Sequence, residues 1–422
     1  MYPCVCHGQR TLYLRDASQG GAPLKHCVII LDGAAGWPLT VLGGNTTLSA
    51  ARTPHLDALA REGTVGLAVT VPEGHEPSSS TACTSILGYD PVADRVGRGA
   101  IEAASMGLTL APDVIALRMN LVNVEDGLMR SYASGRIPTD ESRAIVKELA
   151  AALATPTFAF HPGVAYRHVL AVKGHPELLE AVYAPAHDIT DKPVESHLPR
   201  GPGAALLLEL MDRARELLRR SPVNARRAER GQLPATDIWP FWPGKAPKGM
   251  VPFEKARGVR GAMTSGVDLL NGLAVLAGLT RLHVVGVSDG PDNDYAAQAE
   301  AGLAALDDHD LVIIHVESPD EAGHAGDADG KLAAIEAIDR EIVARARAAA
   351  TRFARDGGLR ILAMPDHPTP VALKTHAREP VPFVLAGPGI ARNGADRYDE
   401  AAAAATGMTL DPGRLVMDRL LG

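Results

Sequence analysis

Three apolar runs in the chain lack the alternation of a half-exposed strand: residues 26–31, 311–314 and 359–364. Runs of this kind are typical of parallel strands that are buried on both faces. Parallel strands end at the same edge of a sheet, where open α/β folds build their sites. Each run is followed by acidic or imidazole side chains, namely Asp32, then Asp320 and His324, then Asp366, His367 and His376. The pattern therefore predicts an α/β core with a polar site at one sheet edge.

The spacing of Asp320 and His324 favours a metal ion. If a helix begins near Pro319, these two side chains lie one turn apart on the same face. Taken alone, an aspartate after a strand is more often a helix cap or a turn former. Six carboxylate and imidazole residues at three strand ends are harder to explain as caps, so we expect a metal site here.

Residues 113–205 show a different pattern. The segments 114–122 and 164–172 alternate as strands do, the first of them as a strand with one exposed edge. Asp126-Gly127 is a hairpin signal, and a helix is predicted from Thr139 to about Leu153. We interpret this region as a compact α+β insertion that divides the core into residues 26–112 and 206–422.

Two further segments have simpler interpretations. The basic, proline-rich passage 222–248 is interpreted as a hinge that covers the site, with a solvated connecting loop as the alternative, and residues 281–287 are predicted to form another strand. Hydroxyl residues crowd positions 78–81, ahead of a helix of small residues. Such a segment is commonly a capped turn, but a serine at a helix N-terminus beside a divalent cation becomes a nucleophile.

Composition narrows the classes of partner and location. The 422 residues suffice for one large domain and a smaller one, and the net charge of −8 without a run of like charges argues against a nucleic-acid partner. No apolar segment approaches the roughly 20 residues of a membrane span, and the first 25 residues lack a signal-peptide core. We expect a cytoplasmic protein with an N-terminal extension over residues 1–25. Four cysteines are too few for a disulfide framework, and Cys4-Val-Cys6-His7 has no second pair to complete a metal site.

Several motifs together carry a family resemblance over residues 26 to about 390. They are Ile30–Gly33, the Ser79 loop that ends in Ile86–Pro91, Gly97–Ala103, Pro222–Asn224, Asp320–Asp327, and Asp366–Pro370 with His376. With these motifs the chain resembles the archaeal-type branch of the cofactor-independent phosphoglycerate mutases, in the alkaline phosphatase superfamily. The resemblance implies an α/β, alkaline-phosphatase-like core with a mainly parallel sheet flanked by helices, and a smaller inserted α+β domain.

The resemblance also implies a pair of divalent ions, usually Mn²⁺ in this family, with Zn²⁺ and Mg²⁺ as alternatives. By the family pattern, one ion is bound by Asp320, His324 and His376. The other is bound by Asp32, Ser79, Asp366 and His367. Mixed carboxylate and imidazole ligands do not by themselves choose between these metals.

The implied reaction interconverts 3-phosphoglycerate and 2-phosphoglycerate through a phosphoserine at Ser79. Water must be kept out or the phosphoserine would hydrolyse, which is the physical reason for an inserted domain that closes. Arginines are natural clamps for the phosphate and carboxylate of a small substrate. The candidates, each with a surface charge as the simpler reading, are Arg98, Arg118, Arg167 and Arg260. The oligomeric state is not expressed in the sequence.

The chain departs from the family pattern at Ser80, where an aspartate is usual, and at Cys83, where histidine or asparagine is common. The register among Ser78, Ser79 and Ser80 stays open, although the distance to Gly88–Pro91 favours Ser79. A second hypothesis is a metal-dependent phosphohydrolase, or a phosphotransferase with another small acceptor, similar to a homoserine kinase. The chain has no P-loop or kinase glycine loop. A third hypothesis is a non-catalytic metal-binding scaffold.

Overall fold

The computed structural model describes residues 24–94, 96–247, 250–355 and 357–422. The chain forms two compact units, each considered by itself below. Unit 1 holds the described residues of 1–95 and 249–422, and unit 2 those of 96–248. The expected extension over residues 1–25 and the Cys4-Val-Cys6-His7 motif lie outside the described residues, apart from Leu24 and Lys25.

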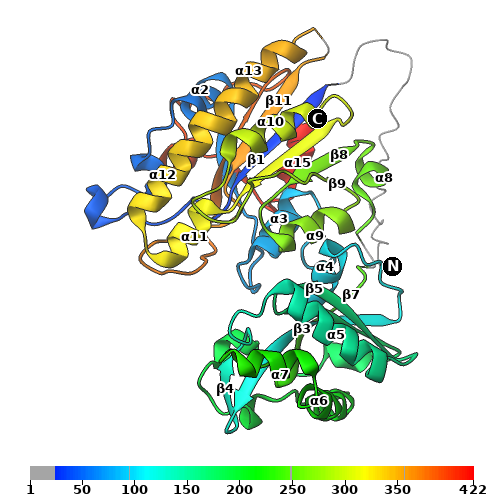
Figure 1. Ribbon diagram of the computed structural model, residues 1–422. Helices are drawn as coiled ribbons and strands as arrows, with labels where there is room; N and C mark the ends of the chain where they lie inside the picture. Colours follow the sequence, from blue (N-terminus) through cyan, green and yellow to red (C-terminus); the bar gives the residue numbers. More distant parts are fainter. Residues whose placement is uncertain (1–23, 95, 248–249, 356) are drawn as a thin grey trace, which may run out of the picture. The chain divides into compact units, whose positions relative to one another are not determined.

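Unit 1 is built on a sheet of eight strands in the order β13-β2-β12-β11-β1-β10-β8-β9 (Figure 1). The strands are β1 Lys25–Leu31, β2 Thr64–Ala68, β8 Gly261–Thr264, β9 Thr280–Arg281, β10 Leu311–Val316, β11 Leu359–Met364, β12 Val381–Ala386 and β13 Thr409–Leu410. Five of them, from β11 to β9, run parallel, whereas β12 is antiparallel to both of its neighbours. The structure thus confirms a mixed α/β core with a mainly parallel sheet.

The three apolar runs form the centre of this sheet. Strand β1 lies between β10 and β11, with Ile30 paired to His315 on one side and to Met364 on the other. From Cys27 to Leu31 the strand is buried almost completely, as expected of a parallel strand covered on both faces. Because the three strands are parallel, the carboxyl ends of β1, β10 and β11 lie at one edge of the sheet. Asp32, Asp320 and Asp366 come after these ends in the sequence and therefore lie at that edge.

Helices surround the sheet of unit 1. They are α1 Thr47–Ala50, α2 Pro54–Glu62, α3 Ser79–Ile86, α8 Phe253–Arg257, α9 Asp268–Leu276, α10 Tyr295–Ala305, α11 Ser318–Ala325, α12 Ala328–Ile338, α13 Ala344–Phe353, α14 Glu400–Ala405 and α15 Leu415–Leu421. A π-helical segment, Asp339–Val343, joins α12 to α13. Helix α10 packs on β10 and α13 packs on β11 (Figure 1).

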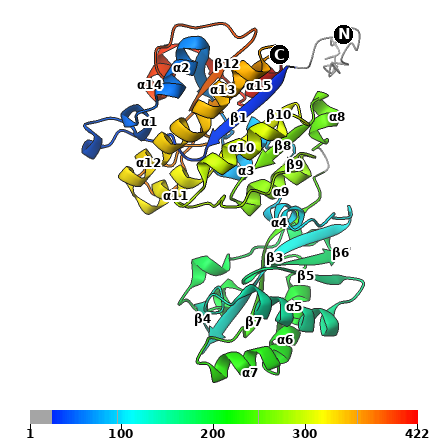
Figure 2. The same ribbon diagram turned by 45° about the horizontal axis from the view of Figure 1, so that its top comes forward.

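Unit 2 is an antiparallel sheet with helices on both of its faces (Figure 2). Its elements are α4 Arg98–Ser105, β3 Val114–Glu125, β4 Leu128–Ser131, α5 Thr139–Leu153, β5 Phe158–Val164, β6 Arg167–Lys173, α6 Ala204–Leu218, α7 Pro222–Glu229 and β7 Asp237–Lys245. Alternate residues of β3 separate the faces: Ile115 and Leu117 join the core with α5 and α6, whereas Ala116 packs with Ala103 of α4.

The boundaries of unit 2 correct the expected insertion over residues 113–205. Strand β7 pairs with β3 over Ile115–Val122, and α4 packs on both strands, so residues 96–112 and 206–247 belong to the same unit. Most of the described part of the proline-rich passage is therefore helix α7 and strand β7 and not a loop. Strand β3 is not an edge strand either, because β6 and β7 flank it.

Two smaller expectations have mixed outcomes. The hairpin at Asp126-Gly127 and the helix from Thr139 to Leu153 are confirmed. The strand expected over 281–287 is reduced to the short β9, Thr280–Arg281. Within the part of the chain that the structure describes, no helix is both long enough and apolar enough to cross a membrane.

Candidate metal centre and nucleophile

The candidate site lies at the carboxyl ends of the central strands of unit 1. Asp32 directly follows β1, and Asp366 and His367 follow β11. Helix α11 starts two residues after β10, and its spacing places Asp320 and His324 on one face, as predicted. Pro319 lies in the first turn of this helix, where its missing N–H costs nothing.

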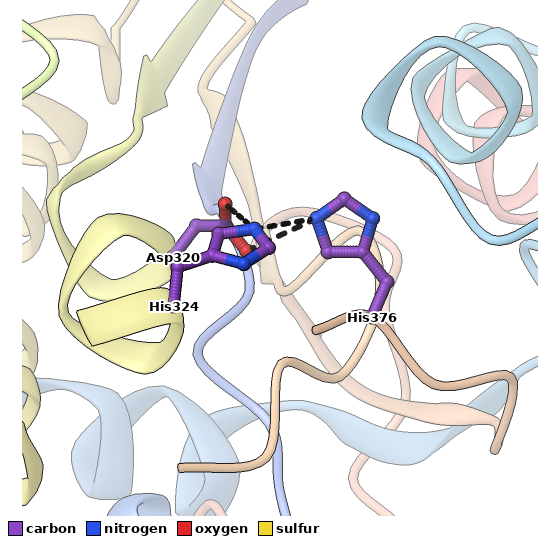
Figure 3. Close-up of side chains that lie close together, drawn as sticks. All are labelled: Asp320, His324 and His376. Atoms are coloured by element: carbon purple, nitrogen blue, oxygen red, sulfur yellow. Dashed lines mark hydrogen bonds and ion pairs between the residues drawn. The ribbon is translucent and has the colours of Figure 1, made fainter. Parts of the chain in front are cut away.

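Asp320, His324 and His376 point toward one another (Figure 3). His324 Nε2 lies 3.1 Å from Asp320 Oδ2, and His376 Nε2 lies 3.6 Å from Asp320 Oδ1. The two imidazole Nε2 atoms are only 2.9 Å apart. Helix α11 supplies two of these side chains and the segment after β11 supplies the third, so the group depends on the sheet that joins them.

The tautomers of the two imidazoles can be assigned from their other nitrogens. His324 Nδ1 lies 3.1 Å from the Lys374 carbonyl oxygen, and His376 Nδ1 lies 3.0 Å from the Pro77 carbonyl oxygen. A carbonyl oxygen only accepts, so each Nδ1 donates its hydrogen, and each Nε2 is left with a lone pair. Two lone pairs and a carboxylate therefore converge on one point, which is the arrangement that a divalent cation requires.

A proton on one imidazole is the alternative to a cation at this point. The hydrogen bond to Asp320 raises the pKa of His324 to about 9. Burial opposes the ionisation of Asp320, but the hydrogen bonds from His324 and His376 outweigh burial and lower the pKa of that carboxyl. Metal binding here would release a proton, as it does wherever ligands must be deprotonated.

A second group consists of Asp32, Asp320 and His367, all of them buried. His367 Nε2 lies 3.6 Å from Asp32 Oδ1 and 3.2 Å from Asp366 Oδ2. Burial, together with the charges of Asp366 and Asp320, raises the pKa of Asp32 well above its ordinary value. Asp32 Oδ1 has no hydrogen-bond donor among the described residues. A fully buried carboxylate oxygen without a donor, facing an imidazole, fits a bound cation.

The second group shares Asp32 and His367 with the expected ligand set, whereas Asp320 was expected at the other ion. We expected Asp32, Ser79, Asp366 and His367, and the structure brings all four together. One oxygen of Asp366 is already engaged by backbone N–H groups: Oδ1 accepts from Gly33 N at 3.1 Å and from His367 N at 2.8 Å. Its Oδ2 is the oxygen that faces His367.

Ser79 is the serine that faces this group. Its Oγ lies 3.2 Å from His367 Nε2, and the residue is buried as the first residue of α3. The other two serines of the register are occupied elsewhere: Ser78 caps α3 by accepting from Thr81 N, and its Oγ lies 3.1 Å from Ser80 Oγ. Of the three serines, Ser79 is thus the one whose hydroxyl lies beside His367.

Several supporting residues were not identified from the sequence as part of the site. His315 Nε2 donates to Asp32 Oδ2 at 2.7 Å, and Ser265 Oγ lies 3.0 Å from His315 Nδ1. Thr369 Oγ1 donates to Asp320 Oδ1. Lys331 Nζ, fully buried, donates to the carbonyl oxygens of Ala35 and Thr369. Each of these contacts holds a proposed ligand or the backbone beside it.

Glu317 completes a third group with Asp32 and His315 that could hold a cation. Its Oε2 is buried without a hydrogen-bond donor among the described residues. Burial and the charge of Asp32 raise the pKa of Glu317 well above its ordinary value. Several carboxylates therefore lie close together at this edge of the sheet, where their mutual repulsion favours protonation or a bound cation.

Gly33 allows helix α11 to lie close to the end of β1. Its φ is +62°, and a Cβ there would lie 2.4 Å from Asp320 Oδ1 and 2.8 Å from Asp320 Cα. Both the left-handed backbone and the space exclude a larger residue. The Asp32-Gly33 pair in the sequence therefore combines a candidate ligand with the space that lets Asp320 lie beside it.

The four arginines expected to bind substrate are divided between the two units. Arg98, Arg118 and Arg167 belong to unit 2, where Arg98 and Arg118 share the carboxylate of Glu102. Arg260 belongs to unit 1, but it is exposed, precedes β8 and donates to the Asp308 carbonyl oxygen. Because β8 and β10 are parallel, Arg260 lies at the end of the sheet opposite the site. Its expected role as a substrate clamp is not supported by this position.

Cys83, one of the two departures from the family pattern, lies beneath the site. Its Sγ is 3.9 Å from Asp366 Oδ2, and burial with the charge of Asp366 raises the pKa of the thiol well above its ordinary value. Cys83 is therefore a neutral packing residue. Cys27 is likewise a buried free thiol.

Comparisons with known proteins show the family of this chain. A family model described as 2,3-bisphosphoglycerate-independent phosphoglycerate mutase matches residues 60–224. A protein of Geobacter sulfurreducens named as a probable 2,3-bisphosphoglycerate-independent phosphoglycerate mutase is 43% identical over 403 residues, covering 94% of this chain and all of the relative. The chain belongs to this family. A mutase of Methanothrix thermoacetophila is 42% identical over 384 residues, covering 91% of this chain and 96% of the relative.

Solved structures agree on the fold of the phosphoglycerate mutase family member described here. A protein of Pyrococcus horikoshii superposes with a TM-score of 0.77 at 26% identity, covering 95% of this chain and 97% of its own. The cofactor-independent phosphoglycerate mutase of Thermoplasma acidophilum superposes with a TM-score of 0.66 at 26% identity, covering 94% and 99%. The family recognised from motifs is thus confirmed over nearly the whole chain.

Proposed function

We propose that this phosphoglycerate mutase interconverts 3-phosphoglycerate and 2-phosphoglycerate through a phosphoserine at Ser79, beside a pair of divalent ions. The observation that carries the proposal is the position of Ser79 Oγ, buried and 3.2 Å from His367 Nε2 in a cluster of carboxylates and imidazoles. Relatives named as mutases support the substrate class. Mn²⁺ remains our first expectation, with Zn²⁺ and Mg²⁺ as alternatives.

The ligands we propose are those that converge in unit 1. Asp320, His324 and His376 would hold one ion, and Asp32, Ser79, Asp366 and His367 the other. When bound, such ions lower the pKa of a serine hydroxyl and offset charge on the transferring phosphoryl oxygens.

The chain itself contributes to the nucleophile. Ser79 begins α3, so the unpaired backbone N–H groups of the first turn and the helix dipole favour negative charge at its Oγ. Burial of the residue keeps water away from the phosphoserine, which would otherwise be hydrolysed. Ser78 fixes the start of the helix by capping it and therefore orients Ser79.

The transfer balances without any added reactant. Ser79 Oγ attacks the phosphorus of 3-phosphoglycerate, the Oγ–P bond forms, the P–O3 bond breaks, and the proton lost by the Ser79 hydroxyl is made up at the O3 of glycerate. After the glycerate turns, its 2-hydroxyl oxygen attacks the same phosphorus, the Oγ–P bond breaks, and the proton lost by that hydroxyl is returned to Ser79 Oγ. Arg98, Arg118 and Arg167 are proposed to bind the anionic groups of the substrate. Phosphoglycerate is a glycolytic intermediate, so we place this reaction in the cytoplasm.

The experiment follows both products of 3-phosphoglycerate with the Mn²⁺-loaded protein. We expect 2-phosphoglycerate without inorganic phosphate. Phosphate alone would establish the phosphohydrolase instead, and phosphate transfer only to an added alcohol such as homoserine would establish the other phosphotransferase. If the metal-loaded protein formed neither product, the non-catalytic metal-binding scaffold would be the hypothesis that remains.

The nucleophile is tested by Ser79→Ala, with Ser80→Ala as the matched control on the same helix. We expect Ser79→Ala to lower turnover by roughly a thousandfold or more, because covalent catalysis ends with its nucleophile. Ser80→Ala should keep most of the turnover. A Ser79→Ala protein that still formed 2-phosphoglycerate at the original rate would exclude Ser79 as the phosphoryl carrier.

A further inference from the structure

Strand β7 of unit 2 contains a bulge at Trp242. Leu117 of β3 pairs with Pro243 and Arg118 pairs with Phe241, so Trp242 is the extra residue. Its φ is +50°, a left-handed conformation that a bulky side chain rarely adopts. Bulges re-aim a side chain, and strain of this kind persists only where the surrounding structure enforces it. The position of the Trp242 ring is therefore specified by its neighbours.

Two guanidinium groups lie against this ring. Arg98 Cζ is 4.3 Å and Arg118 Cζ is 5.4 Å from the centroid of Trp242. Both distances are within the range of a cation–π interaction, for which tryptophan is the strongest partner. The rings of Phe241 and His187 pack beside Trp242, with centroids 4.7 Å and 5.4 Å away. Phe241 and His187 therefore help to fix the indole ring, and the indole ring in turn contacts Arg98 and Arg118.

The positive charge of this cluster exceeds the negative charge supplied to it. Glu102 Oε1 lies 3.1 Å from Arg118 Nη1 and 3.8 Å from Arg98 Nε, so one carboxylate serves two guanidinium groups. Arg98 Nε, although buried, has no hydrogen-bond acceptor among the described residues. Burial, with the charges of Arg118 and Arg167, lowers the pKa of Arg98, although an arginine stays protonated at neutral pH. An additional anion would relieve this imbalance.

The geometry points to Trp242 as a positioning residue. We infer that its ring fixes the guanidinium groups of Arg98 and Arg118 in advance, so that unit 2 binds an oxyanion of the substrate without help from any metal. This inference rests on the proposed function for the identity of the substrate. The oxyanion is either the phosphate or the carboxylate of phosphoglycerate, since guanidinium groups recognise both in the same way. Preorganised arginines bind more tightly because less side-chain entropy is lost.

The test measures binding to the full-length protein after treatment with EDTA. Isothermal titration with 3-phosphoglycerate, inorganic phosphate and glycerate compares wild type with Trp242→Phe, Trp242→Ala and Trp242→Gly. Trp37→Phe, an exposed tryptophan of unit 1, is the matched control. We expect Trp242→Ala and Trp242→Gly to weaken binding by about tenfold or more and Trp242→Phe to lie between, because a phenyl ring is a weaker cation–π partner.

Comparison of glycine with alanine separates the ring from the strained backbone. Glycine tolerates a φ of +50°, so Trp242→Gly should melt at a higher temperature than Trp242→Ala while binding equally poorly. If Trp242→Gly bound like wild type, the bulge and not the ring would matter, and the inference would be overturned. Equal binding by wild type and all variants, or no binding by wild type without metal, would overturn it as well.

Turnover supplies an independent measure. In the metal-loaded protein we expect Trp242→Ala to raise KM by about tenfold with kcat little changed, since the lost contact acts equally on substrate and transition state. A fall in kcat at unchanged KM would contradict the inference. Binding of phosphate but not glycerate would identify the phosphate as the group bound, and the reverse would identify the carboxylate. Absence of mutase turnover with intact oxyanion binding would count against the proposed function alone.

Discussion

At the scale of single residues, Asp32 depends on a histidine inside a strand. His315 is fully buried in β10, and its hydrogen bond to Asp32 Oδ2 leaves Oδ1 directed at His367. Ser265 fixes the ring in turn: its Oγ accepts from Val267 N and lies 3.0 Å from His315 Nδ1. Such partners behind a ligand set its orientation and basicity.

We therefore expect His315→Gln to weaken Mn²⁺ binding by roughly 10- to 100-fold. His309→Gln, beyond the opposite end of the same strand, is the control and should bind Mn²⁺ like wild type. Electron paramagnetic resonance of free Mn²⁺ during a titration measures both affinities. Unchanged affinity in His315→Gln would show that Asp32 needs no such partner.

The residues foreseen from sequence and those that were not differ in where they lie. Asp320, His324 and Asp366 were predicted because they follow apolar strands, and strand ends meet whatever the exact register. The role of His315 depends on the pairing of β10 with β1, which a single sequence does not express. Arg260 was named as a candidate substrate clamp without regard to strand direction. It precedes β8, so it lies at the end of the sheet opposite the candidate site.

At the scale of elements, strand β6 of unit 2 carries a pH-sensitive residue. His168 is buried, and its Nδ1 accepts from Gly163 N at 3.0 Å. Burial, reinforced by the charge of Arg143, lowers the pKa of His168 from 6.5 to about 3. The folded protein therefore holds this imidazole neutral at pH values where the unfolded chain protonates it.

The sign of the effect follows from that difference. Because the folded pKa lies below the unfolded one, the stability contributed is complete above pH 6.5 and is lost as pH falls toward 3. At pH 5 the loss from this residue is about 2 kcal/mol, since each pH unit costs up to about 1.4 kcal/mol. Denaturant unfolding of wild type and His168→Asn at pH 7 and pH 5 measures it. The variant should lose less stability between the two values, and an equal loss would refute the assignment.

Strand β7 explains why the elements of unit 2 were predicted less well than those of unit 1. Pro240 and Pro243 lack the N–H of a regular strand, so the passage reads as a loop. Among the described residues β7 pairs with β3 alone, and an edge strand tolerates proline. The apolar runs of unit 1 contain no proline, and a short run of apolar residues without alternation is typical of a strand that is buried on both faces.

At the scale of the whole molecule, the carboxylates of unit 1 predict a response to chelation. Asp32, Asp320, Asp366 and Glu317 gather at one buried edge, where like charges repel. Bound cations should stabilise unit 1 by about 2.7 kcal/mol at a hundredfold excess over Kd. Calorimetry should show a transition that falls on adding EDTA and recovers with Mn²⁺, while the transition of unit 2 stays in place. An EDTA-insensitive profile would contradict a metal site in unit 1.

The domain boundaries were the part of the architecture least accessible from sequence. The expected insertion ended at residue 205, whereas α6, α7 and β7 complete the second unit. Composition reveals a domain boundary only where the linker is long, polar and irregular. Near residues 95 and 248 the sequence offers only a few prolines and glycines as a signal of a boundary.

The discontinuous core of unit 1 has a consequence for synthesis. Asp32 and His315 are 283 positions apart, so β1 leaves the ribosome long before either of its neighbours exists. Until β10, Leu311–Val316, is translated, this apolar strand has neither of its sheet partners and is a target for aggregation or for chaperones. Unit 2 is contiguous in sequence, so the nascent chain can finish its sheet first, and the sheet of unit 1 is the last to form.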